Sequence, residues 1–133
     1  MKTSICMVFA MAILGTGCST MESVRSEEGR GKVKTFEAPY AVVFKAAVEG
    51  GKSGLLRLRK VEPGFIYSET DTRGDSWGEN VCIWVRERGT NITEVEVLSR
   101  QAGPALFFHF NWEDEILETI QAMVDAERIS STP

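Results

Sequence analysis

Hydrophobic and polar residues follow two different periods along the chain, and each period predicts one kind of element. Apolar side chains recur every three or four residues after Pro39 and again after Asn111, as on one face of a helix. Alternating runs predict strands over residues 33–36, 55–61, 65–70, 81–86 and 93–97. The resulting order, β-α-β-β-β-β-α, is α+β: a single mostly antiparallel sheet with two helices packed on one face.

The hairpin over residues 81–97 has the best-determined register. Its apolar positions face one another when Val85 is opposite Val95 and Ile83 is opposite Val97. The same register places Arg86 opposite Glu94 on the other face, a favourable pair. It leaves a three-residue loop, 89–91, in which we expect Asn91 to be left-handed. In the hairpin before it, Phe65 and Tyr67 compete with Ile66 for the core-facing positions.

The two long helices have recognisable ends. Pro39 opens the first, where a missing N–H costs nothing, and Gly50-Gly51 is expected to end it in a left-handed conformation. Asn111 is a good N-cap for the second, with acidic residues in the first turn that suit the helix dipole. We expect this last helix to end at about residue 127 or 128.

The first 17 residues predict a secretory signal peptide. Lys2 is followed by an apolar run, Ile5–Leu14, and then by small residues. A helix of that length covers about 15 Å, roughly half of the hydrocarbon core of a bilayer, so a stable membrane span is not expected.

The residues after this segment resemble a bacterial lipobox. Leu14-Gly15-Thr16-Gly17-Cys18 has the small residues and the cysteine of that motif, but has Gly15 where the family usually has Leu. The resemblance implies a diacylglycerol thioether on Cys18 and cleavage before it. Ser19, rather than Asp, after the cysteine implies the outer membrane. An ordinary signal peptide with a nearby cysteine, or an uncleaved anchor, is the alternative.

These observations divide the chain into four parts. Residues 1–17 are the expected signal peptide, and residues 18–31 are the lipidated cysteine with a polar, flexible tether. Residues 32–129 form a single α+β domain, and residues 130–133 a C-terminal tail. With 15 Lys and Arg against 19 Asp and Glu, the formal charge is −4, so we expect no nucleic-acid partner.

We expect no enzyme, metal or cofactor. His109 is the only histidine, and Cys82 is the one cysteine left after processing, in mid-strand among apolar residues, as a packed, inert thiol would be. Gly50–Gly54 contains Gly-Lys-Ser but follows a helix instead of opening one, so a phosphate loop is rejected. The acidic residues 113–115 are explained by the helix start.

Four aromatic residues are candidates for an exposed surface that contacts an envelope partner: Trp77, Trp84, Phe108 and Phe110. Trp84 points away from the valine face of its strand, Trp77 lies in a Gly-bracketed loop, and residues 106–110 hold three Phe. The alternative is a carrier of a small apolar ligand, with a cleft between sheet and helices lined by Phe44, Trp84 and Phe108.

The mature domain also resembles a family of small bacterial lipoproteins of unknown function. More distantly, it is similar to the helix-grip domain of lipoprotein C of the outer-membrane β-barrel assembly machine. The segments that carry the resemblance are Ala38-Pro39-Tyr40, Phe44-Lys45-Ala46-Ala47, Pro63-Gly64-Phe65-Ile66-Tyr67 and Ile116-Leu117-Glu118-Thr119-Ile120. It implies a fold and an envelope location, with the domain facing the periplasm, and no particular activity.

Overall fold

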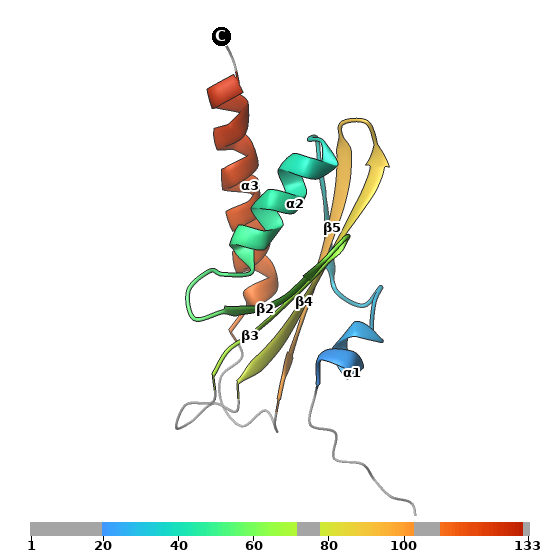
Figure 1. Cartoon of the computed structure of the whole chain (residues 1–133), viewed down its shortest axis with the longest axis vertical. Helices are drawn as coiled ribbons and strands as arrows, with labels where there is room; N and C mark the ends of the chain where they lie inside the picture. Colours follow the sequence, from blue (N-terminus) through green and yellow to red (C-terminus); the bar gives the residue numbers. More distant parts are fainter. Residues whose placement is uncertain (1–19, 72–77, 103–109, 132–133) are drawn as a thin grey trace, which may run out of the picture.

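The computed structural model describes residues 20–71, 78–102 and 110–131. In chain order its elements are α1 (Met21–Arg25), β1 (Lys32–Phe36), α2 (Tyr40–Gly50), β2 (Arg57–Glu62), β3 (Phe65–Glu69), β4 (Glu79–Gly89), β5 (Ile92–Gln101) and α3 (Trp112–Ser131). The strands form one antiparallel sheet in the order β1-β5-β4-β3-β2. The α+β fold expected from the sequence is confirmed (Figure 1).

The register of the β4–β5 hairpin is as predicted. Val85 pairs with Val95, Ile83 with Val97, and Arg86 with Glu94. The loop differs, because Gly89 pairs with Ile92 and a register shift between Glu87 and Gly89 takes up the extra residue within β4. Among the described residues only glycines have positive φ, so Asn91 is not left-handed. The left-handed Asn91 was therefore a wrong prediction.

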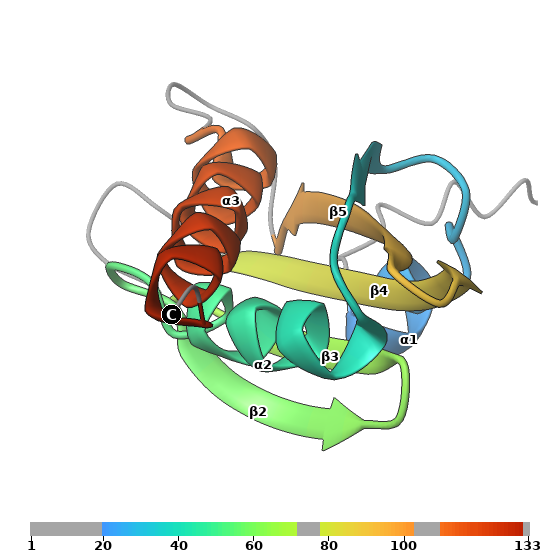
Figure 2. The ribbon, with the colours of Figure 1, turned by 90° about the horizontal axis from the view of Figure 1, so that it is seen from above.

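Helices α2 and α3 lie side by side on one face of the sheet and enclose the main core (Figures 1 and 2). The sheet contributes buried apolar side chains to it from four strands, and α3 contributes five residues: Trp112, Ile116, Leu117, Ile120 and Val124. Ile66 points into this core, whereas Phe65 and Tyr67 are buried on the opposite face. Both alternatives left open for this hairpin are therefore buried, one on each side.

The ends of α2 and α3 correct two details. Gly51, the C-cap of α2, has φ −68°, so the expected left-handed end is wrong. The two glycines are needed for space instead: a Cβ on Gly51 would lie 2.9 Å from Ser68 Oγ, and one on Gly50 would lie 3.1 Å from Ile116 Cγ2. Asn111 Oδ1 accepts from the Asp114 N–H at 3.1 Å, as expected of an N-cap, but α3 runs on to Ser131, so residues 130 and 131 are helical and not tail.

The flexible tether expected over residues 19–31 is wrong for the part that is described. Thr20 and Ser23 form a capping box that opens α1, with Thr20 Oγ1 accepting from the Ser23 N–H and Ser23 Oγ accepting from the Thr20 N–H. Val24 is fully buried against the face of the sheet that α2 and α3 leave uncovered (Figure 1). The sequence pattern missed this helix because only Met21 and Val24 form its apolar side.

Because Val24 fills a core position, Val24→Ala is expected to lower the free energy of unfolding by about 2 kcal/mol. Urea unfolding of the purified protein, followed by far-UV circular dichroism, measures the change. The matched control is Val33→Ala, since Val33 is 50% exposed on the edge strand β1, and this variant should remain within about 0.5 kcal/mol of wild type. Equal losses in the two variants would contradict the docking of α1.

Candidate functional site

The structure separates the predicted site residues. Cys18, Trp77, Phe108 and also His109 lie outside the described residues. Phe110 is 52% exposed, with its ring centroid 4.5 Å from that of Trp112. Trp84 is only 4% exposed, so its place on an exposed partner surface is a wrong prediction. Its side chain does point away from the main core, as expected, but α1 covers that face.

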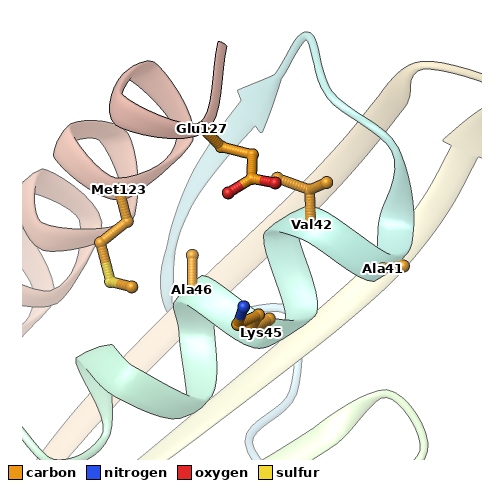
Figure 3. A pocket seen from close by; sticks show the side chains of 6 residues that line it. All are labelled: Ala41, Val42, Lys45, Ala46, Met123 and Glu127. Carbon is orange, nitrogen blue, oxygen red and sulfur yellow. The ribbon is translucent and has the colours of Figure 1, made fainter. Parts of the chain in front are cut away.

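The cleft expected between sheet and helices does not form with the predicted lining. Phe44 packs against the core beneath α2 and α3, whereas Trp84 belongs to the cluster on the other face of the sheet. A groove of about 280 Å³ lies elsewhere, between α2 and α3 (Figure 3). Ligand pockets are typically about 300–1,000 Å³ in volume. The groove between α2 and α3 is therefore slightly smaller than a typical ligand pocket. It is lined by Ala41, Val42, Lys45, Ala46, Met123 and Glu127.

The N-terminal segment, residues 20–31, is attached to the sheet first through an apolar cluster. Val24 and Met21 pack on five side chains of the sheet: Phe65, Tyr67, Cys82, Trp84 and Leu98. At the end of α1, the Arg25 guanidinium lies 4.1 Å from the centre of the Phe65 ring, and its Nη2 is 2.9 Å from Glu62 Oε2. This cation–π contact and ion pair fix the side of the helix next to β3.

The second attachment is a buried carboxylate. Glu96, on β5, is 1% exposed, and its Oε2 accepts from the N–H groups of Gly29 at 2.7 Å and Gly31 at 2.8 Å. Its Oε1 accepts from Arg86 Nη2 at 2.7 Å. We call Gly29, Gly31, Arg86 and Glu96 the Glu96 clasp. A buried charge needs such donors, since an unpaired one costs several kcal/mol.

The glycines of the Glu96 clasp suit its geometry. Gly29 has φ +97°, a conformation that other residues rarely adopt. A Cβ on Gly31 would lie 2.6 Å from the Val97 carbonyl oxygen. The two glycines of Gly29-Arg30-Gly31 therefore allow a close approach of the backbone to β5, which the prediction of a flexible tether does not include.

Ion pairs surround the Glu96 clasp. Arg100 Nε is 3.0 Å from Glu27 Oε2, and Arg86 is 3.3 Å from Glu28 Oε1. Across the hairpin, Arg86 Nη1 is 2.9 Å from Glu94 Oε1, and the hydrogen bond from Arg88 lowers the pKa of the Glu94 carboxyl. Ion pairs at the surface contribute at most about 1 kcal/mol each, so we expect the exposed pairs to add little to the attachment.

Cys82 and Tyr67 lie in the same apolar cluster. Cys82 is fully buried, and burial raises the pKa of its thiol to about 12. Burial, assisted by a hydrogen bond to Glu69, also raises the pKa of the Tyr67 phenol, whose oxygen lies 2.6 Å from Asn80 Oδ1. Both groups stay protonated at neutral pH. A thiol of this kind is a poor nucleophile and a poor metal ligand.

The acidic residues at the start of α3 have structural partners. Glu113 Oε1 accepts from the Ser99 N–H at 3.0 Å, and Asp114 is paired with Lys32. The hydrogen bond from Lys32 lowers the pKa of Asp114. Across residues 20–71, 78–102 and 110–131, no group of three or more His, Cys, Asp or Glu side chains is placed to hold a metal ion. In the same ranges, no helix is both long and apolar enough to cross a membrane.

Comparisons with known proteins give no family for this chain. No protein-family model matches it, and a search of curated proteins finds no match.

The burial of Cys82 predicts a thiol that does not react in the folded protein. In a variant with Cys6→Ser and Cys18→Ser, Cys82 is the only thiol, and it should fail to react with Ellman's reagent at pH 8 until the protein is unfolded in guanidinium chloride. Adding Thr90→Cys, an exposed position in the β4–β5 turn, should restore one fast-reacting thiol. Rapid reaction of Cys82 under native conditions would show that α1 does not seal this face.

Proposed function

We propose that this protein is a lipoprotein of the bacterial outer membrane, anchored by acyl chains on Cys18, whose domain faces the periplasm. It acts by contact with another protein and not by catalysis. One observation carries the proposal: the lipobox-like cysteine is separated by a single residue from Thr20, the N-cap of a helix packed on the domain.

The acyl chains supply the attachment. Each buried methylene contributes about 0.8 kcal/mol, so two or three chains hold a protein on a bilayer effectively permanently. The formal charge of −4 gives the protein no electrostatic attraction to anionic lipids that could act as a second anchor.

Phe110 is the residue that we propose contacts a protein partner. It is half exposed, and its ring packs at an interplanar angle of 56° against Trp112, a buried residue that holds the ring in place. A large apolar side chain fixed at the surface is a favourable anchor for a partner. Trp84 is removed from this surface by its burial, and Trp77 and Phe108 remain predictions.

Lipidation predicts a specific N-terminal peptide. Expressed in a Gram-negative host, the membrane-fraction protein should yield a peptide that starts at acylated Cys18, and Cys18→Ser should abolish it. Mass spectrometry measures both. In a companion variant, Ser19→Asp should move the acylated protein from the outer-membrane to the inner-membrane fraction of a density gradient, as the sorting rule for such lipoproteins implies. An unmodified peptide, or one that retains Met1, would refute the anchor.

If a protein partner binds at Phe110, a crosslinker at position 110 should capture it and one at position 129 should not. The photoreactive residue p-benzoylphenylalanine at position 110 should give a discrete protein adduct in intact cells after irradiation. At position 129, where the native Ile is 78% exposed near the end of α3, it should give none. Adducts of the same size and yield at both positions, or none at either, would contradict a partner site at Phe110.

A further inference from the structure

We propose that the domain is held against the bilayer in one orientation. The end of the sheet at which β4 begins and β5 ends faces the membrane, and the β4–β5 turn points away from it. This inference rests on the proposed lipid anchor at Cys18. It goes beyond that anchor because it states how the domain stands on the membrane surface.

The first step is the length of chain between the anchor and the domain. Cys18 and Thr20 are separated by one residue, so their Cα atoms are at most about 8 Å apart. A flexible tether over residues 19–31 would have had a root-mean-square span on the order of 20 Å. With Thr20 already part of the capped helix, only Ser19 separates the lipid-bearing residue from the folded protein.

The second step is that residues 20–31 are fixed to the sheet along their length. Val24 is fully buried, and Arg25 is paired with Glu62 and stacked on Phe65. Further along, the Glu96 clasp binds the backbone of Gly29 and Gly31. The segment therefore has no slack that could be drawn out without breaking the cover of Trp84 and its neighbours. The position of Thr20 is set by the sheet.

The third step is the place of α1 in the fold. Its first residues lie toward the end at which β4 begins and β5 ends, and the β4–β5 turn lies at the opposite end (Figure 1). β4 has 11 residues, so it spans on the order of 35 Å. With Thr20 held at the headgroups, an upright domain carries its turn far beyond the lipid surface.

The fourth step distinguishes the upright domain from one lying on its α1 side. That side exposes charged side chains, among them Arg25 at 42%, Glu28 at 51% and Arg30 at 74%. Placing such a surface on a bilayer would remove water from charged groups without burying apolar area in return. The upright orientation leaves these groups in water.

A two-position quenching experiment tests this orientation in the acylated full chain. One added cysteine, Ala102→Cys near the end of β5 or Thr90→Cys in the far turn, carries an environment-sensitive fluorophore. Cys82 remains unlabelled because it is buried. In vesicles of phosphatidylethanolamine and phosphatidylglycerol containing a headgroup spin-labelled lipid, we expect quenching at position 102 to be several-fold stronger than at position 90.

The matched control inserts a 15-residue Gly/Ser linker between Ser19 and Thr20. This variant should still float with the vesicles, but quenching at the two positions should become equal and weak, because a flexible linker of this length frees the domain. Equal quenching at both positions without the linker, or stronger quenching at position 90, would overturn the orientation. Failure of the acylated peptide to appear, or of the protein to float, would instead refute the anchor, and the orientation with it.

Discussion

Apolar side chains on both faces of the central strands are the constraint on which the rest of the structure depends. On β4, Ile83 points into the core under α2 and α3, while its neighbours Cys82 and Trp84 point to the other face. A sheet of this kind is stable in water only when both faces are covered. Two long helices cover one face, and the cover for the other comes from residues that precede the first strand.

The small cover on the second face depends on polar contacts as well as on burial. α1 has five residues, far fewer than the 12–15 that an isolated helix needs for even marginal stability. Its apolar contact with the sheet is therefore combined with the Glu96 clasp, in which a buried carboxylate binds two backbone N–H groups and Arg86. Without residues 29–31, Glu96 Oε2 would lose both of its backbone N–H donors and only the contact with Arg86 would remain, so the clasp and the helix stabilise each other.

Features that depend on neighbouring positions in the chain could be predicted from the sequence, whereas features that depend on contacts between distant positions could not. The strands, the β4–β5 register and the stripes of α2 and α3 were predictable, because periodicity reports directly which side of an element is buried. The helix at Met21–Arg25 was not, because its burial depends on contacts with residues more than 40 positions away. One sign was present: the unbroken apolar run from Val81 to Val85 is typical of a strand buried on both faces, which requires a second cover.

The candidate site was less predictable than the fold for the same reason. The sequence pattern places Trp84 on the face opposite the valines but does not show that α1 covers that face. Because Trp84 is buried, its apolar surface stabilises the fold and is not available to a partner. With Cys18 acylated, the segment that seals this face is also the one that joins the domain to the lipid. Pulling the domain away from the membrane would then require unfolding α1 and exposing Trp84 and Phe65. With the domain close to the bilayer, the acyl chains can stay in the membrane while α1 stays packed on the sheet.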